Sequence, residues 1–546
     1  MKITYKDREF EVEEGTPLRK ALKEVMPKGT IAARFNNVLA SLNHPITQDG
    51  NVEFIDRTSK DGRDIYVRGL LYLASMAAEK AYPRSKFSVN YQLRNCMFCE
   101  FADMEVTDEV AINIKTEMDN IIRENVPITK KEMTPEEAEK FYEKFPSIRG
   151  KLQLNVNKEK VSLYFCKDYY NYFYGTMPIS TGFAEVYDIV KYGDGLLVRY
   201  PSREEPNKLP PHQNTLKLAS ALKEYDDIHK LVGISTVYNL NKAIREGKIK
   251  ELILFSEALH EKKISEIAKM IKDRGNVRMV LIAGPSSSGK TTFAGKLSMS
   301  LMVNGIKPVT ISVDNYFVER EQNPVDENGQ YDFERIDALD LDLLNSQLVS
   351  LLNGEEVSLP TFDFTTGHKK YLGNTLKLKP DQIIIMEGIH CLNNKLTSLI
   401  PDEQKFKVYT SDLTVLNIDY YNRISTTDTR LIRRLVRDHK FRNYSALHTL
   451  SMWYSVNRGE QKYIFPYQEQ ADVMFNSSMI YEIAVLKKYA VPLLQEIGPE
   501  EAVYSEARRL LSMLQYFDEM DDTMIPNNSL IREFIGGSIF EKWKKQ

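Results

Sequence analysis

The chain has 546 residues, which at about 150 residues per domain predicts roughly three to four domains. Its 73 Lys and Arg residues nearly balance 76 Asp and Glu residues, so no overall charge draws it onto nucleic acid or an anionic membrane. A hydrophobic content of 42% with 27% charged residues is typical of a folded globular protein and excludes a mainly disordered one. No apolar run has the length of a membrane span and the first residues do not resemble a signal peptide, so we expect a cytoplasmic protein.

Residues 1–60 alternate short apolar strands with one helix. Thr16 as the helix cap, followed by Pro17 at the first helical position, predicts where that helix begins. This pattern is typical of a small β-grasp unit. From residue 61 an apolar helix precedes two acidic-basic helices around residues 107–145 and a strand-rich segment over residues 152–200.

A polar stretch rich in proline places a domain boundary near residue 206. The second predicted domain is therefore an α+β unit over residues 61–205. Residues 206–275 have apolar positions at helical spacing and are predicted to be a helical connector. An α/β domain follows over residues 276–485, and residues 486–546 are predicted to be a mostly helical tail.

Four cysteines are too few and too scattered for a disulfide framework: Cys96, Cys99, Cys166 and Cys391. Cys96 and Cys99 have the spacing of half a zinc site, but no second CxxC pair and no HxxxH pair lies nearby. Bystander thiols are therefore favoured, and metal binding by this pair stays open.

Residues 284–291, GPSSSGKT, match the phosphate-binding pattern GxxxxGK[ST] between an apolar strand and a helix-compatible run. The glycines let successive backbone N–H groups converge on phosphate oxygens at a helix N-terminus. Lys290 is expected to reach the β- and γ-phosphates, and the Thr291 hydroxyl to ligate Mg²⁺. The residues predicted to bind the nucleotide here are Gly284, Ser286, Ser287, Ser288, Gly289, Lys290, Thr291 and Thr292.

Two acidic residues follow later apolar strands. Asp314 ends the run VTISV, and Glu387 ends the run IIIM. Because the carboxyl ends of parallel strands meet at one edge of a sheet, both are expected beside the phosphates. Asp314 is suited to take a proton from an attacking hydroxyl or to hold Mg²⁺, with a helix cap as the alternative. Glu387 is suited to orient Mg²⁺ or its water.

Four arginines at the spacing i, i+3, i+4 and i+7 share one face of a predicted helix: Arg430, Arg433, Arg434 and Arg437. Like charges at these spacings repel, which is tolerable where a polyphosphate or a carboxylate such as Asp428 or Asp438 lies opposite. A solvated basic face is the alternative.

The segments GPSSSGKTT, SVDNYF, YDFERIDALD, LPTFDF, IIIMEGIH, TRLIRRLVRD and QADVMFN resemble, in order and spacing, the uridine kinase/phosphoribulokinase family over about residues 276–485. The resemblance implies a P-loop kinase fold with a mostly parallel sheet. It also implies ATP and Mg²⁺ as cofactors and transfer of the γ-phosphoryl group to a sugar hydroxyl, in uridine kinases that of a nucleoside. Because related uridine kinases assemble as homo-oligomers, it is also compatible with a homo-oligomer.

The resemblance also implies roles for individual residues. Asp314 becomes the catalytic acid position beside Lys290, and Glu334 the ribose-contacting position. Glu387, with Thr291, becomes associated with Mg²⁺. The lid arginines correspond to Arg434, Arg437 and Arg442, and the remaining substrate-binding positions to Phe362 and His368.

The pocket that reads the base departs from the family pattern. Phe317 stands where a second tyrosine hydroxyl is usual, and Glu334 lies in Phe-Glu-Arg-Ile instead of Phe-Asp-His-Pro. Phe362 replaces a tyrosine, His368 comes one residue late, and Met452 stands where a glutamine is expected. Since a missing hydrogen-bond partner changes discrimination strongly, phosphoryl transfer is predicted and the nucleobase stays open.

Residues 1–60 resemble a TGS domain, and residues 61–205 resemble the second additional domain of threonyl- and alanyl-tRNA synthetases, most clearly in YGTMPISTG. The metal ligands of that family's editing site correspond here to Arg68, Tyr72, Phe173 and Met177. These side chains do not replace the lost ligand set, so we expect the fold without tRNA editing.

Two other functions stay open beside the nucleoside kinase. The front modules could bind tRNA or ribosomal RNA while the P-loop domain acts as an ATP switch, or the kinase could act on another sugar or phosphosugar. The aromatic run over residues 169–174, next to Lys167, could stack unpaired bases, although a core face is favoured at strand spacing.

Overall fold

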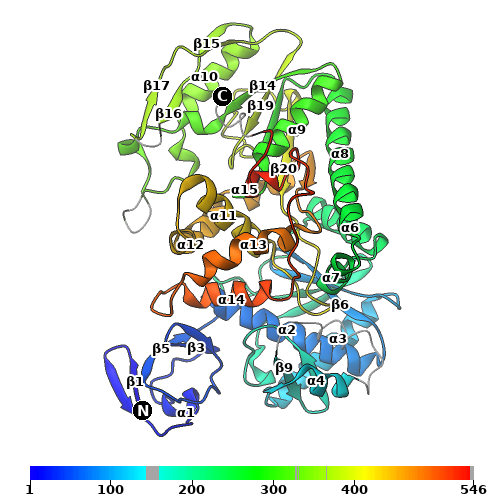
Figure 1. Ribbon diagram of the computed structural model, residues 1–546, viewed down its shortest axis with the longest axis vertical. Helices are drawn as coiled ribbons and strands as arrows, with labels where there is room; N and C mark the ends of the chain where they lie inside the picture. The colour runs from blue at the N-terminus through cyan, green and yellow to red at the C-terminus, as the bar shows by residue number, and fades with distance from the viewer. Residues whose placement is uncertain (143–158, 326–328, 330, 364–365, 541–546) are drawn as a thin grey trace.

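The computed structural model describes residues 1–142, 159–325, 329, 331–363 and 366–540. The N-terminal 200 residues form the lower part of the molecule in Figure 1, and the residues after them form the upper part. The ends of the segments predicted as helices to residue 145, as strands from residue 152 and as a tail to residue 546 lie outside the described residues. Among the helices that the structure describes, none is both long and apolar enough to cross a membrane.

The first unit is a five-stranded sheet in the order β2-β1-β5-β3-β4, with β1 and β5 parallel. Its strands are β1 (Lys2–Tyr5), β2 (Arg8–Glu11), β3 (Ala32–Phe35), β4 (Val38–Ala40) and β5 (Gly50–Ile55). The single helix, α1 (Leu18–Ala21), packs the buried Leu18 against Ile3 of β1. The predicted Thr16 cap is wrong, because Pro17 occupies the cap position and the helix has only one turn.

The second unit packs its helices against antiparallel sheets. Its helices are α2 (Lys60–Ala81), α3 (Asp108–Glu124) and α4 (Pro135–Tyr142). The four-stranded sheet, in the order β11-β12-β7-β6, comprises β6 (Phe87–Leu93), β7 (Cys96–Phe101), β11 (Asp188–Tyr192) and β12 (Gly195–Arg199). The three-stranded sheet comprises β8 (Thr129–Met133), β9 (Val161–Cys166) and β10 (Tyr169–Tyr172). A 3₁₀ turn, η1 (Thr181–Phe183), precedes β11.

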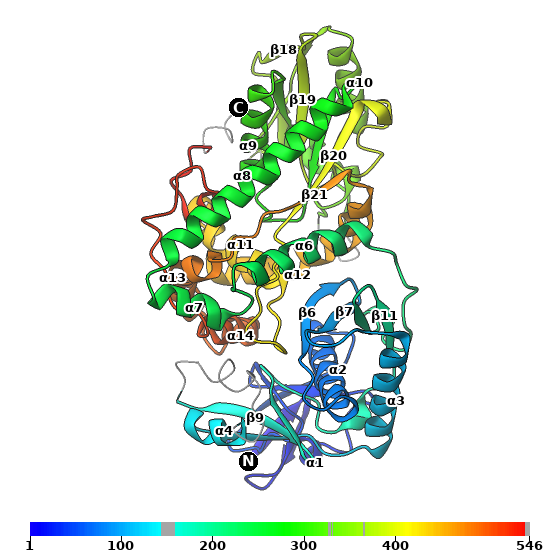
Figure 2. The ribbon, with the colours of Figure 1, turned by 90° about the vertical axis from the view of Figure 1, so that its right-hand side faces the viewer.

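Three helices then lead to the upper part: α6 (Leu216–Leu231), α7 (Val237–Arg245) and α8 (Ile249–Arg274). Figure 2 shows α8 running from α7 up along the parallel sheet. Buried Ile264, Ile267, Ala268 and Ile271 recur at helical spacing along α8, so one face of this long helix packs against the domain that follows.

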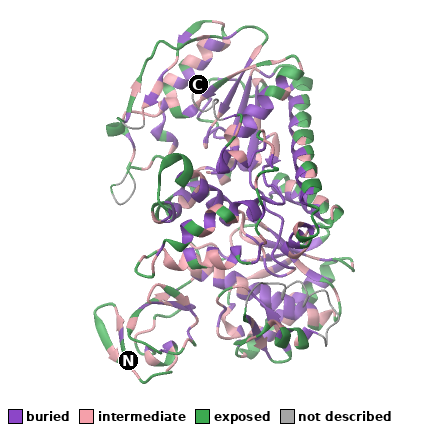
Figure 3. Cartoon of the chain, viewed as in Figure 1, coloured by how far each residue is buried: buried purple, intermediate pink, exposed green. Residues whose placement is uncertain are grey.

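The upper part is built on a five-stranded parallel sheet in the order β14-β19-β13-β20-β21. Its strands are β13 (Met279–Ala283), β14 (Lys307–Ser312), β19 (Gln382–Glu387), β20 (Lys405–Ser411) and β21 (Val473–Asn476). All five residues of β13 are buried, as expected for a central parallel strand covered on both faces. Figure 3 shows the central strands of this sheet mainly in the colour of buried residues. The predicted parallel sheet is confirmed.

The chain around and below this sheet forms α9 (Lys290–Val303), α10 (Leu341–Leu352), α11 (Thr426–Arg442), α12 (Ala446–Tyr463), α13 (Glu482–Gln495), α14 (Tyr504–Leu514) and α15 (Arg532–Ile535). Helix α9 packs on β13, β14 and β19, whereas α14 lies next to the front half. Two small hairpins extend from it: β15 (Glu356–Ser358) with β18 (Thr375–Lys377), and β16 (Thr361–Asp363) with β17 (His368–Lys370). Short 3₁₀ turns lie at η2 (Val313–Tyr316), η3 (Arg320–Gln322), η4 (Ile336–Ala338), η5 (Asp402–Gln404) and η6 (Phe465–Gln470).

The segment between β20 and α11 is held by the second unit. The Val89 N–H donates to the Tyr420 carbonyl over 2.8 Å, and the Tyr174 N–H donates to the Asn422 side chain over 2.8 Å. The Asn417 amide donates back to the Asn90 carbonyl over 3.0 Å, and Tyr421 is buried within the core of the second unit. The front half therefore fixes the chain that leads directly into α11.

Candidate active site

Residues 284–289 form the turn between β13 and α9, and Lys290 and Thr291 begin the helix. Gly289 has a left-handed φ of 80°, and a side chain at Gly284 would collide with the Thr410 carbonyl, so both positions require glycine. The Lys290 ammonium donates to the Gly284 and Pro285 carbonyls over 2.9 and 3.0 Å. Its charge therefore lies over the loop whose amides are expected to hold phosphate.

The sheet order places the two strand-end acids beside this loop. Glu387 pairs in register with Ile282 of β13 on one side and with Ser312 of β14 on the other. The Thr291 hydroxyl donates to the Glu387 carboxylate over 3.4 Å. Asp314 follows β14 in η2, two residues beyond Ser312. The structure thus brings Lys290, Thr291, Glu387 and Asp314 to one edge of the sheet.

The surroundings raise the pKa of both carboxyls. Burial, with the negative charges of Asp314 and Glu533 nearby, raises the pKa of Glu387 to about 7, against the opposing effect of Lys290. Partial desolvation by the surrounding protein also raises the pKa of Asp314, and the charges of Lys290 and Arg442 oppose that shift. Asp314 nevertheless remains open to solvent, so an acceptor can reach it.

The arginines of α11 do not form a single basic face. Arg430 makes a two-point ion pair with Glu460 of α12, including one contact of 2.8 Å. Arg433 binds the Glu482 carboxylate at the start of α13 and the Ser477 carbonyl. Arg430 and Arg433 are 1% and 0% exposed, so these two guanidiniums are fixed inside the fold.

The remaining arginines gather around one buried carboxylate. Asp438 forms ion pairs with Arg434 at 3.2 Å, Arg437 at 2.7 Å and Arg442 at 3.5 Å. Arg434 also donates to the Ser286 hydroxyl of the loop over 2.8 Å. A carboxylate shared among three cations offsets their repulsion, and Arg434 extends that cluster to the phosphate-binding loop.

Glu460 belongs to the site, although no motif in the sequence analysis included it. It accepts a hydrogen bond from the Ser286 N–H over 3.0 Å, while Arg430 donates to the Ser286 carbonyl over 3.2 Å. The Arg430–Glu460 ion pair thus binds both the backbone N–H and the backbone carbonyl of Ser286. An acid on the same helix face as the buried Trp453 and Val456 was the available signal.

Aromatic side chains gather near η2, the turn that contains Asp314. The Phe362 and Phe317 rings are 5.6 Å apart, and the Phe362 N–H donates to the Asn315 side chain over 3.5 Å. Phe333 packs on Phe317 at 6.4 Å, a contact that the sequence alone did not indicate. These rings form an apolar wall that includes Phe317, three residues after Asp314.

The other predicted substrate residues occupy different surroundings. Glu334 lies against Gly459 of α12, and burial together with the charge of Glu460 raises its pKa to about 7. His368 is exposed, and its imidazole lies 2.6 Å from the Glu319 carboxylate. Met452 is 44% exposed on α12. Glu334 therefore lies near the phosphate-binding loop, whereas His368 lies in the β16–β17 hairpin.

The four positions compared with an editing site lie in one core. Tyr72 packs edge-on against Phe173 at 5.5 Å and donates to the Tyr164 carbonyl over 3.1 Å. Arg68 donates to the Thr176 carbonyl, and Met177 is buried. Within the described parts of the chain, no group of three or more His, Cys, Asp or Glu residues could hold a metal ion.

The aromatic run over residues 169–174 also serves packing. Tyr169, Tyr172 and Phe173 are buried, and the Tyr174 hydroxyl donates to the Arg509 carbonyl of α14 over 2.8 Å. The expected core face is confirmed, and these rings connect the front half to the C-terminal helices.

Cys96 and Cys99 do not share a site. They lie three residues apart in β7, so their side chains leave opposite faces of the strand. Cys99 is part of the core beneath α2, whereas Cys96 packs against a separate cluster that contains Tyr91 and Phe98. Two thiols on opposite faces cannot bind one ion together.

Residues 279–484 match the Phosphoribulokinase / Uridine kinase family. The chain is similar to the uridine kinases of Staphylococcus aureus strains JH9 and Newman, each 29% identical over 205 residues, which is 37% of this chain and 89% of the relative. The C-terminal half therefore contains a P-loop kinase domain of this family.

Two solved structures are also similar to this chain. A possible uridine kinase from Bacillus stearothermophilus is 21% identical, with a TM-score of 0.28, and covers 39% of this chain and 98% of its own. A putative fructose transport system kinase from Silicibacter sp. TM1040 is 13% identical, with a TM-score of 0.26 and the same coverage.

Proposed function

We propose that this protein is an ATP-dependent kinase that transfers the γ-phosphoryl group to a hydroxyl of a nucleoside. The observation that carries the proposal is the meeting of Lys290, Thr291, Glu387 and Asp314 at one sheet edge, next to the loop over residues 284–291. A cation, a hydroxyl, two carboxylates and a set of loop amides are the groups that phosphoryl transfer requires.

Each group has a proposed task. The loop amides bind the phosphates, and Lys290 exchanges its two carbonyl partners for phosphate oxygens. The Thr291 hydroxyl and the Glu387 carboxylate, which already lie in hydrogen-bond contact, would hold Mg²⁺, whose charge would offset that of the phosphates. Asp314 accepts the proton of the attacking hydroxyl, and its raised pKa suits a general base.

The α11 cluster supplies further positive charge. Arg434 already contacts Ser286 of the loop, and Arg437 and Arg442 share Asp438 with it. We propose that these three arginines approach the transferred phosphoryl group, where guanidiniums suit bidentate contact with its oxygens. Arg430 and Arg433 have a different task, because burial and ion pairs hold them in place.

A nucleoside is the acceptor class that the aromatic wall favours. Phe333, which is 46% exposed, presents ring surface on which a base can stack, and it packs on Phe317, three residues after Asp314. The similarity to uridine kinases supports the same class. The nucleobase itself is left open, because these phenylalanines lack the hydroxyl groups that would read it.

The division into residues 1–60, 61–205, 206–275, 276–485 and 486–546, with a TGS-like and a synthetase-like module in front, is part of this proposal. We expect these front modules to regulate the kinase and not to edit tRNA, since Phe173 is packed in the core, Arg68 is bonded to the Thr176 carbonyl, and neither offers a ligand suited to zinc.

The test is ADP release from MgATP by the full-length protein against nucleosides, sugars and phosphosugars. Lys290→Ala is the blank, and Lys307→Ala is the matched control because Lys307 is an exposed lysine paired only at the surface with Asp381. Stimulation by a nucleoside that requires Lys290 supports the proposal. Stimulation by sugars or phosphosugars alone replaces the acceptor class, and no stimulation by any acceptor contradicts the kinase function.

A further inference from the structure

The C-terminal segment, residues 525–540, packs directly on the phosphate-binding loop. A side chain at Gly289 would come within 2.6 Å of a Leu530 methyl group, and one at Gly295 within 2.7 Å of the Phe540 ring. Leu530 and Phe534 are fully buried. Figure 1 shows α15, in red, beside α9 and above α11. Residues 525–540 therefore lie over the part of the fold that is expected to receive the nucleotide.

One carboxylate of this segment occupies the start of α9. The Thr292 N–H donates to the Glu533 carboxylate over 3.0 Å, and both residues are buried. Amides in the first turn of a helix have no carbonyl partner within the helix. In a P-loop these same amides, aided by the helix dipole, hold phosphate oxygens. Glu533 thus supplies a negatively charged acceptor where a phosphate group would supply one.

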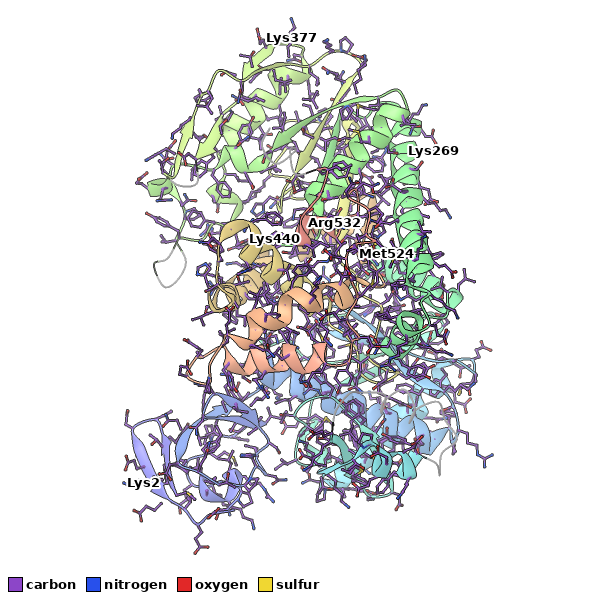
Figure 4. The ribbon with its side chains drawn as sticks, viewed as in Figure 1. Lys2, Lys269, Lys377, Lys440, Met524 and Arg532 are labelled. Atoms are coloured by element: carbon purple, nitrogen blue, oxygen red, sulfur yellow. The ribbon has the colours of Figure 1, made fainter. Side chains whose placement is uncertain are left out.

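Residues of α11 hold the segment from its other side. Lys440 donates to the Ile535 carbonyl, and the Arg433 guanidinium lies 5.0 Å from the centre of the Phe534 ring. Figure 4 labels Lys440 and Arg532 near one another at the centre of the molecule. The segment is therefore fixed between α9, which follows the loop, and α11, which carries the arginine cluster.

A phosphate and Glu533 compete for this position for two reasons. The Thr292 N–H is a single donor, so it serves one strong acceptor at a time. Two anions at one helix N-terminus also repel each other, so a phosphate group next to the Glu533 carboxylate would be disfavoured. Binding of a polyphosphate therefore requires that the carboxylate leave.

We propose that residues 525–540 form an autoinhibitory segment, in which Glu533 takes the α9 amide that a nucleotide phosphate needs, so that the nucleotide binds after this segment has been displaced. The inference rests on the proposed function, because it takes a nucleoside triphosphate as the ligand of the loop. It goes beyond that function by assigning a regulatory role to a segment for which the sequence suggested no chemistry.

The test is the dissociation constant of MgATP and MgADP, measured by titration calorimetry on the full-length protein. Glu533→Ala removes the competing acceptor, and Glu533→Gln keeps the shape while removing the charge. Glu519→Gln is the matched control, since Glu519 is an exposed acid in the same C-terminal region. We expect both Glu533 variants to bind nucleotide more tightly, by about tenfold for Glu533→Ala, as for loss of a competing charge-assisted hydrogen bond.

A second readout needs no variant. Backbone amide exchange of residues 529–536 in the unaltered protein is expected to accelerate when MgADP saturates the loop, because the segment leaves its contacts with α9 and α11. If Glu533→Ala fails to fold, this measurement still tests whether nucleotide binding displaces residues 525–540.

The outcomes separate this inference from the function on which it rests. Unchanged or weaker nucleotide binding by both folded Glu533 variants, or slower exchange of residues 529–536 with MgADP, overturns the inference, while loss of binding in Lys290→Ala still supports the nucleotide site. Absence of nucleotide binding in the unaltered protein and in both Glu533 variants contradicts the proposed function and the inference together.

Discussion

Arg509 of α14 donates two hydrogen bonds, of 2.8 and 2.6 Å, to the carboxylate of Asp428 in the first turn of α11. The same guanidinium binds Glu506, which lies 3.5 Å from Lys60 at the start of α2. A chain of ion pairs thus joins the front half of the molecule to the helix that carries the arginine cluster. Any motion of α11 must be accommodated by this network.

Replacing Arg509 with methionine is expected to destabilise the protein by about 3 kcal/mol, because it leaves Asp428 and Glu506 largely buried without their shared partner. We also expect a higher KM for ATP, since α11 loses its anchor. Urea unfolding and steady-state kinetics measure the two effects. Arg508→Met is the control, because Arg508 is the exposed neighbour on the same helix. Equal stability and equal KM in the two variants would show that the ion-pair network contributes neither to stability nor to ATP binding.

Asp314→Asn is expected to lower kcat by about 10²–10⁴-fold, the usual contribution of a general base, while nucleotide affinity stays close to that of the unaltered protein. The amide keeps the shape of the side chain but cannot accept the proton. Asp342→Asn, an exposed acid in the first turn of α10, serves as the control and should retain full activity. A fully active Asp314→Asn enzyme would remove Asp314 from its proposed role.

Glu334→Gln is expected to change stability in a manner that depends on pH. The pKa of Glu334 is raised to about 7 in the folded protein from an ordinary value of 4.5, so folding favours the neutral carboxyl. Below pH 4.5 the group is neutral in both states and contributes no penalty. Between pH 4.5 and 7 ionisation increasingly favours the unfolded state, and above pH 7 the penalty is complete.

Glu334→Gln should therefore be more stable than the unaltered protein by roughly 1–2 kcal/mol at pH 8. This is only a fraction of the free energy that corresponds to the full pKa shift, because the side chain is not completely shielded from water. Near pH 4.5 the two proteins should be equally stable. Chemical denaturation at the two pH values measures the difference. Glu355→Gln, a change of an exposed acid, is expected to show no such pH dependence.

The Arg430–Glu460 pair allows a test that separates stability from loop geometry. Glu460→Gln leaves the buried Arg430 charge unbalanced and is expected to cost about 3–5 kcal/mol of stability. The double variant Arg430→Met with Glu460→Met should recover much of that stability. Its affinity for nucleotide should nevertheless stay below that of the unaltered protein, because the Ser286 N–H and carbonyl have both lost their partners. Normal affinity in the double variant would show that the pair serves packing alone.

Several parts of the site could be predicted from short stretches of sequence. The glycines and Lys290 between an apolar strand and a helix, and the acids Asp314 and Glu387 directly after apolar strands, needed only local rules. Parallel strands bring their carboxyl ends together, so local placement was enough to predict that these residues meet.

The partners of the arginines required the tertiary structure. The spacing of Arg430, Arg433 and Arg434 places them near one another on α11, yet it does not say which carboxylate each one meets. Glu460 lies 30 residues from Arg430 along the chain, and Glu482 lies 49 residues from Arg433. Helix geometry fixes the direction of a side chain, whereas the packing of other helices decides what lies opposite.

The sequence by itself thus determined the phosphate-binding loop, the parallel sheet and the two acids at its edge, because each depends on a contiguous pattern and on strand geometry. Only the tertiary structure placed Glu533 on the Thr292 N–H, 241 residues away in the chain, and joined Lys60 to Glu506 and Arg509 to Asp428. Such contacts form because elements that are distant in the sequence pack their apolar faces together. Charged groups that become buried in this way must pair with a group of the neighbouring element.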